Sequence, residues 1–181
     1  MATTTRKRST AKAAPKAAKT EPAAAEPVKV IPQEVDVHQY IPVINGFNGI
    51  LIYKSSRTGE VFRWDNFGDE QDMELMELRN AKNTSKAFFI NNWFLFGEDY
   101  EWVLDYLGMR NFYRNAVNVE GFDEIFQKTP AEIKKVIKEM SDGQKKSLMY
   151  RSRELIASGE IDSRKAIAAL EEALGVDLIE K

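Results

Sequence analysis

The feature that most constrains the fold of this chain is the stretch ILIYKSSRTGEVFRW, residues 50–64. Two runs rich in β-branched and aromatic residues flank a polar turn over residues 56–59. Gly59 supplies the positive φ that a tight turn between two strands needs. The stretch therefore predicts a β-hairpin.

The turn also fixes which residues of the two strands face each other. With residues 56–59 in the turn, Tyr53 lies opposite Phe62, and Leu51 lies opposite Trp64. This register gathers one apolar row on one face of the hairpin. Because an isolated hairpin is marginally stable in water, we expect the aromatic-rich segment 88–113 to cover that face.

Length and composition predict a globular chain. With 181 residues, 43% of them hydrophobic, the chain can hold one domain, or one domain with a small appendage. It has no cysteine, which excludes disulfides and thiolate metal sites and favours a reducing compartment. It shows neither the apolar core of a signal peptide nor a run long enough to cross a membrane.

Residues 1–33 are predicted to be a disordered basic arm rich in Ala, Lys and Pro. Residues 1–27 contain six Lys and Arg against two Glu, so they carry +4, and the rest of the chain carries -6. Arg6, Lys7 and Arg8 are candidate contacts for nucleic acid or for an acidic partner protein. A solvated arm, or one that threads across a partner, is the alternative.

Between Val28 and Ile44 β-branched residues alternate with polar ones, which predicts extended structure. Pro32 and Pro42 interrupt the pattern, and this favours an edge strand or two short strands. Together with the hairpin, the pattern predicts an antiparallel meander over residues 35–64. The sheet is expected to have three strands.

An acidic run follows the hairpin and precedes an apolar-periodic segment. Asp69, Glu70 and Asp72 suit the N-terminus of a helix, where the helix dipole favours negative charge. The same acids are candidates for a Ca²⁺ or Mg²⁺ site, but the spacing of an EF-hand loop is missing. A wider carboxylate site around Asp65, Asp69 and Asp72 is the enzyme alternative.

Residues 88–113 contain ten of the chain's nineteen aromatic residues. Residues 93–96 predict a short buried strand, and residues 98–107 a helix that Gly108 ends. Acidic residues surround the rings, whereas base-stacking platforms alternate with Lys and Arg, so core packing is favoured. Any aromatic excess over the core is a candidate partner interface, formed by Trp93, Phe94, Phe96 and Trp102.

The last third predicts three helices joined by tight turns. The capping box over residues 129–132 starts a helix that runs to about Met140. A second helix starts over residues 141–144 and runs to Gly159, and a third runs from near Asp162 to Gly175. These signals divide the folded part into an α+β domain, residues 34–116, and a helical subdomain, residues 117–181.

The middle helix, residues 144–158, is the basis of a nucleic-acid alternative. Short turns between helices are typical of helix-turn-helix proteins, and this helix carries Lys145, Lys146, Arg151 and Arg153. The following helix is acidic and the folded part is negative. A charge-balanced helical bundle is therefore favoured over a nucleic-acid reader.

The sequence lacks the usual signatures of catalysis. The only histidine is His38, in a segment predicted to be a strand, and there is neither a nucleophilic cysteine nor a Gly-x-Ser-x-Gly motif. Phosphate-binding glycine loops are also missing. These observations predict a protein that is not an enzyme and that needs no cofactor or metal.

Four segments carry a resemblance to a known group of proteins. They are TGEVFRWDNFGDEQDMELMEL, FFINNWFLF, VLDYLG and RELIASGEIDSRKAIAALEEALGVDL. Their order resembles that of a group of small proteins encoded by tailed bacteriophages, over residues 35–181. The resemblance implies a structural or accessory protein of the virion, with other virion proteins as partners. It further implies a location in the host cytoplasm during assembly and then in the virion.

Together these patterns predict an α+β fold. A small three-stranded antiparallel sheet is packed by aromatic-rich helices and is followed by a C-terminal helical bundle. The predicted function is a non-enzymatic structural or assembly role through protein–protein contacts and the flexible arm. A nucleic-acid-binding regulator that uses the arm and helix 144–158 is the alternative.

Overall fold

The structure is a computed structural model, and it describes residues 34–179. The predicted arm, including Arg6, Lys7 and Arg8, lies outside the described residues. In chain order the elements are β1 (Tyr40–Asn45), β2 (Leu51–Lys54), β3 (Val61–Trp64), β4 (Glu70–Glu74), α1 (Leu75–Thr84), α2 (Ala87–Ile90), β5 (Phe94–Leu95), η1 (Glu98–Tyr100), α3 (Trp102–Tyr106), η2 (Arg110–Phe112), α4 (Val119–Glu124), η3 (Ile125–Gln127), α5 (Pro130–Glu139), α6 (Asp142–Ser158) and α7 (Arg164–Leu174).

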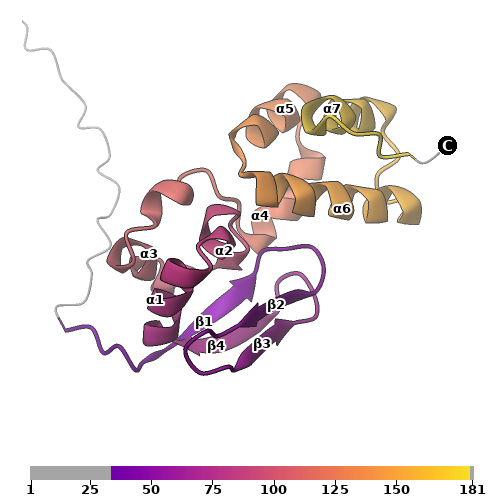
Figure 1. The fold of residues 1–181 in the computed structure, drawn as a ribbon. Helices are drawn as coiled ribbons and strands as arrows, with labels where there is room; N and C mark the ends of the chain where they lie inside the picture. The colour runs from indigo at the N-terminus through magenta and orange to yellow at the C-terminus, as the bar shows by residue number, and fades with distance from the viewer. Residues whose placement is uncertain (1–33, 180–181) are drawn as a thin grey trace, which may run out of the picture.

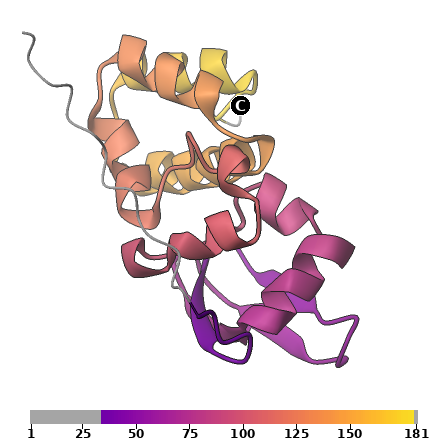
Figure 2. The same cartoon turned by 90° about the vertical axis from the view of Figure 1, so that its left-hand side faces the viewer.

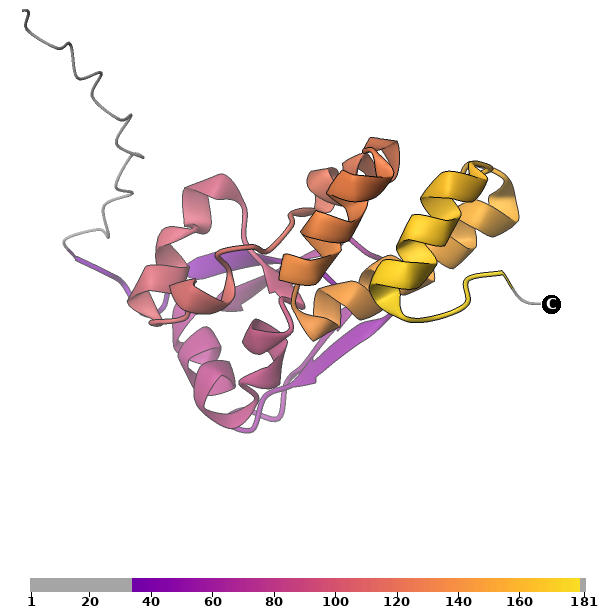
Figure 3. The same ribbon diagram turned by 90° about the horizontal axis from the view of Figure 1, so that it is seen from above.

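The elements form the predicted α+β fold, in which the strands and the first helices share one part of the molecule and the last helices form another. Figure 1 shows α1, α2 and α3 beside the strands, and α5 and α7 at the opposite end. In Figure 2, α6 lies between the strands and the pair formed by α5 and α7. Seen from above in Figure 3, α5 and α7 lie next to each other, and they pack together.

The hairpin forms with the predicted register. Strands β2 and β3 are antiparallel, with Tyr53 opposite Phe62 and Leu51 opposite Trp64. All four side chains are at most 9% exposed, so the predicted apolar row is buried. Gly59 has φ +77°, the conformation that the turn was expected to need.

The predicted meander over residues 35–64 is wrong, because β1 does not pair with the hairpin. Strand β1 pairs with β4 and β5 in a three-stranded antiparallel sheet of order β4-β1-β5, and β2 and β3 form a separate sheet. The buried side chain of Asn45 directs the chain away at the end of β1. Its amide donates to the carbonyls of Gly49 and Asn66, at 2.9 and 2.8 Å. The indole N–H of Trp64 donates to the Val43 carbonyl at 2.9 Å. This hydrogen bond connects the hairpin to β1.

The edge position predicted from Pro42 is also wrong, because β1 is the central strand. Strand β5 reaches only Ile44 and Asn45, so β1 has a free side at Pro42. A proline lacks the N–H that a fully paired central strand would need. The shortness of β5 is what makes proline acceptable there.

The prediction that Asp69, Glu70 and Asp72 open a helix is wrong as well. Glu70 and Asp72 lie on strand β4, and α1 begins only after that strand. Met73 of β4 pairs with Ile41 of β1, and both side chains are fully buried. Backbone pairing with β1 and the burial of Met73 therefore override the helical periodicity of the segment.

The aromatic-rich segment packs largely into the first core cluster, which also contains the inner row of the hairpin. Phe89 and Phe94 are fully buried, and the predicted short strand is β5. The predicted helix over residues 98–107 is observed as η1 followed by α3. Gly108 follows with φ +66°. His38 lies in an exposed turn rather than in a strand.

The last third contains the predicted helices around a second core cluster. Helix α5 starts at the predicted capping box, where the Glu132 carboxylate accepts from the N–H and the hydroxyl of Thr129, at 2.9 and 2.6 Å. Helix α6 starts at Ser141, whose hydroxyl accepts from the Gln144 N–H at 3.2 Å. It ends at Gly159, with φ +80°.

Helix α6 also connects the helical part to the α+β part through hydrogen bonds and a close backbone contact. The Ser147 hydroxyl donates to the Gly46 carbonyl at 3.0 Å, and the Ser141 hydroxyl donates to the Asn91 carbonyl at 3.1 Å. Gly143 lies so close that a Cβ atom there would be 2.3 Å from the Asn91 carbonyl oxygen. The backbone of α6 thus packs directly on the α+β part.

Candidate protein-binding surface

Three large apolar side chains lie exposed on and beside the hairpin. Ile50, Ile52 and Val61 are 53%, 51% and 56% exposed. We call these three residues the hairpin surface. Apolar side chains grouped in this way on a strand pair are typical of surfaces that another chain covers.

The hairpin surface follows from the alternation of side chains along a strand. Because the inner row is buried, the alternate residues of β2 and β3 point outward. Ile52 lies opposite Arg63, and Val61 lies opposite Lys54. Ile52 and Val61 therefore each have a cation across from them, and Arg63 also pairs with Asp65 at 2.7 Å. This combination fits a partner surface that is apolar and carries acidic groups.

The strands of the hairpin also have open edges. Within residues 34–179, β2 and β3 pair only with each other. The outer backbone N–H and C=O groups of such strands are a template on which a further strand can add. The hairpin surface and these edges belong to the same two strands.

A groove begins at one end of the hairpin surface. It has a volume of about 550 Å³ and lies between Ile50, Phe67 of the loop after β3, and Val119 of α4. Arg151 and Glu154 of α6 form part of its wall. A chain bound along the hairpin surface can extend into this groove.

A buried carboxylate holds the hairpin on α1. Glu77 is 2% exposed and accepts from the Tyr53 hydroxyl at 2.7 Å, from Arg57 Nε at 3.1 Å and from Asn80 Nδ2 at 2.9 Å. Burial opposes the charge of Glu77, but the donors around it hold its pKa below the ordinary value. Burial and the adjacent Glu77 carboxylate raise the pKa of Tyr53. The hydrogen bonds of Glu77 on the buried side of the hairpin therefore fix the position of the hairpin surface.

The structure separates the four aromatic residues that were candidates for an interface. Phe94 is fully buried in the core, so its inclusion is wrong. Trp93, Phe96 and Trp102 are partly buried and pack against the same core cluster. The ring of Trp93 contacts that of Phe47, with centroids 5.9 Å apart. These three side chains therefore contribute to the core and are only partly exposed to a partner.

The basic residues predicted on the helix 144–158 lie on α6, and most of them bond within the molecule. The pairs are Lys145 with Asp142 at 3.6 Å, Arg151 with Asp123 at 2.9 Å, and Arg153 with the Asp177 carbonyl at 3.1 Å. The hydrogen bonds that Arg151 donates to the Asp123 carboxylate raise the pKa of Arg151. Lys146 is exposed. Most of the basic side chains of α6 are thus engaged in contacts within the molecule.

The acids that were considered for a metal site take other positions. The Asp69 carboxylate accepts from the N–H groups of Asp65 and Asn66, at 3.1 and 2.7 Å, and so holds the turn after β3. Asp72 lies on β4. In the described part of the chain, no group of three or more His, Cys, Asp or Glu residues is arranged to hold a metal ion.

No helix between residues 34 and 179 combines the length and the apolar character needed to span a membrane. Comparison of the chain with protein-family models, with curated proteins and with solved structures finds no match.

The hairpin surface was not among the predicted site residues, although its signal is present in the sequence. The register that buries Leu51 and Tyr53 also places Ile52 on the opposite face. A polar residue would be expected at a position that faces only water. The isoleucine at position 52 was therefore the sequence signal for the hairpin surface.

Proposed function

We propose that this protein is a non-enzymatic structural or assembly protein of a tailed bacteriophage virion, which acts by binding other virion proteins. The observation that carries the proposal is the hairpin surface, where Ile50, Ile52 and Val61 are each more than half exposed. Covering such side chains removes apolar area from water and favours association. The open edges of β2 and β3 give the partner backbone groups to pair with.

The setting of the proposal comes from the sequence. The segments of residues 35–181 that resemble small proteins of tailed bacteriophages support a role in the host cytoplasm during assembly and then in the virion. The basic composition of residues 1–27 suits an arm that contacts an acidic neighbour. The acidic charge of the rest of the chain makes further copies of this protein possible neighbours.

The nucleic-acid alternative through helix 144–158 receives less support. A nucleic acid that bound Arg151 and Lys145 would compete with Asp123 and Asp142, which already neutralise these cations. Of the four basic residues predicted on this helix, only Lys146 is exposed without a partner among the described residues.

Co-purification from infected cells tests the proposed function. Tagged full-length protein is isolated after nuclease treatment, and the bound proteins are quantified by mass spectrometry. The double variant Ile52→Thr, Val61→Thr keeps the β-branched shape that suits strands but removes apolar surface. We expect this variant to recover at least tenfold less capsid, neck or tail protein than the wild type.

A matched control removes two exposed isoleucines away from the hairpin. Ile90 and Ile179 are 40% and 53% exposed, and the variant Ile90→Thr, Ile179→Thr should recover partners within twofold of the wild type. Circular dichroism confirms that both variants are folded. Equal recovery by the two variants, or recovery of only DNA-associated proteins that nuclease removes, would contradict the proposed function.

A further inference from the structure

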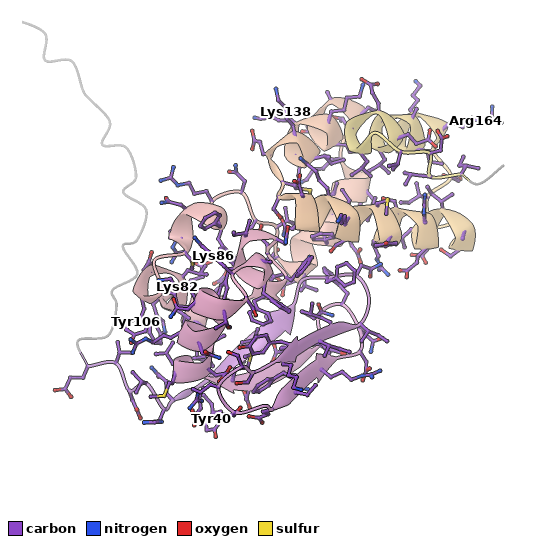
Figure 4. All side chains as sticks on the ribbon, viewed as in Figure 1. Tyr40, Lys82, Lys86, Tyr106, Lys138 and Arg164 are labelled. Carbon is purple, nitrogen blue, oxygen red and sulfur yellow. The ribbon has the colours of Figure 1, made fainter. Side chains whose placement is uncertain are left out.

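Three basic residues follow one another along one side of α1 and the turn after it. Arg79 and Lys82 are three residues apart on α1, which places them next to each other along the helix, and Lys86 lies in the turn after it. Figure 4 shows Lys82 and Lys86 along the same side of the molecule. Within residues 34–179 none of the three takes part in an ion pair.

The local sequence of α1 does not compensate these charges. Like charges at these spacings destabilise a helix, and neither Arg79 nor Lys82 has an acidic residue three or four positions away. The helix dipole favours Lys82 in the last turn of α1, but Arg79 lies one turn earlier. A row of uncompensated cations is typical of a surface that binds an anion.

Aromatic rings from a distant part of the sequence lie beside the row. Tyr106 of α3 lines a cavity of about 320 Å³ together with Arg79 and Lys82. In Figure 4, Tyr106 lies close to Lys82. The Lys86 Nζ atom is 5.1 Å from the centre of the Phe112 ring, which is 39% exposed. Cations and partly exposed rings thus alternate over this face.

The acidic residues of α3 and the residue before it are neutralised by a different cation. Arg110 donates to both carboxylate oxygens of Asp105, at 2.9 and 2.7 Å, and to the Glu101 carboxylate at 3.2 Å. The sequence therefore gives a misleading picture of the charge around Tyr106. The cations of α1 are left available for an outside partner.

This arrangement matches the chemistry of one class of ligand. Single-stranded nucleic acid offers phosphates to cations and base faces to aromatic rings, which is how single-strand binding surfaces work. An acidic peptide would use the cations but would gain nothing from the exposed parts of the rings. We propose that the surface formed by Arg79, Lys82, Lys86, Tyr106 and Phe112, the α1–α3 surface, binds single-stranded nucleic acid.

The test measures binding of a fluorescently labelled oligothymidylate to the full-length protein by anisotropy, over a range of salt concentrations. We expect the variant Arg79→Gln, Lys82→Gln, Lys86→Gln to bind at least tenfold more weakly than the wild type. We plot the logarithm of the association constant against the logarithm of the salt concentration. For this variant the slope should be less steep by about 2, because three phosphate contacts to a single strand are lost. The variant Tyr106→Leu should lose at least fivefold without a change in slope.

The matched control removes the same charges elsewhere. Lys135, Lys138 and Arg164 are exposed in the helical part, and Figure 4 shows Lys138 and Arg164 far from Lys82. The variant Lys135→Gln, Lys138→Gln, Arg164→Gln should bind within twofold of the wild type. Polyglutamate of equal charge should not displace the oligonucleotide.

Three outcomes would overturn the proposal. The first is a wild type without saturable binding, and the second is an equal loss of affinity in the test and control variants. The third is displacement by polyglutamate as effective as by unlabelled oligonucleotide, which would assign the surface to acidic peptides. Circular dichroism and thermal melting of each variant separate lost binding from lost folding.

Discussion

Glu77 is a single buried residue whose hydrogen bonds fix the position of the hairpin surface. Its carboxylate is buried between the hairpin and α1, where donors from three other residues surround it. A charge in such a place is tolerated only because its hydrogen bonds are satisfied. Replacing it with glutamine leaves one acceptor oxygen in place of two, so at least one of these donors loses its acceptor.

We expect Glu77→Gln to lower the free energy of unfolding by about 1–3 kcal/mol at pH 7, the cost of unsatisfied buried polar groups. The control Glu74→Gln removes the other, more exposed carboxylate that pairs with Arg57. It should cost less than about 1 kcal/mol, as for exposed ion pairs. Urea denaturation of both variants measures the difference, and equal effects would show that burial of Glu77 is unimportant.

The same residue predicts a pH dependence. Because the pKa of Glu77 is lower in the folded protein than in the unfolded chain, its contribution is present above the unfolded pKa. It is lost as the pH falls through the folded value. The stability difference between the wild type and Glu77→Gln should therefore be constant near neutral pH and should shrink below about pH 4. A difference that grows on acidification would contradict this sign.

At the scale of elements, the helix caps differ in what they hold. Ser141 caps α6 and also donates to the Asn91 carbonyl in the α+β part. Ser163 caps α7 through the Ala166 N–H at 3.4 Å, and within residues 34–179 its hydroxyl makes no hydrogen bond to the α+β part. One serine thus stabilises a helix and a junction, whereas the other stabilises a helix end.

We expect Ser141→Ala to lower the free energy of unfolding by about 1–2 kcal/mol, at the upper end of the range for lost caps. Ser163→Ala should cost only about 0.5–1 kcal/mol. Chemical denaturation of the two variants, with equal slopes against denaturant, checks the order. A larger loss for Ser163→Ala would mean that the Ser141 bond to Asn91 contributes nothing.

At the scale of the whole molecule, two core clusters meet where two backbones come into direct contact. Gly143 of α6 faces Asn91, and Gly46 after β1 faces the Asn92 carbonyl. A Cβ atom at either glycine would lie 2.3 Å from a carbonyl oxygen. The contact between the α+β part and α6 depends on the missing side chain of Gly143, whereas Gly46 allows a close contact within the α+β part.

Gly143→Ala tests this junction because its two effects have opposite signs. Within a helix, alanine is more stable than glycine by about 1 kcal/mol. Here the added methyl group displaces α6 from Asn91, so we expect a net loss of at least about 2 kcal/mol, as for overpacking. The control Ala157→Gly, at an exposed site of α6, measures the propensity alone. A gain in thermal stability for Gly143→Ala would contradict the contact.

Local patterns in the sequence determined the elements whose stabilising contacts are short in range. The hairpin register follows from alternation and from Gly59, and α5, α6 and α7 follow from caps and terminal glycines. The α+β class follows from the order of these patterns. Each of these signals acts within a few residues of the structure that it fixes.

Tertiary structure decided what depends on partners far along the chain. Strand β4 exists because β1 pairs with it across the hairpin, and Phe94 is buried because distant rings surround it. The α1–α3 surface arises in the same way. Tyr106 has acidic neighbours in sequence, but folding pairs the acids with Arg110 and brings Arg79 and Lys82 beside the ring. Charge and burial act through space, so the sequence determined the local elements and the fold decided the surfaces.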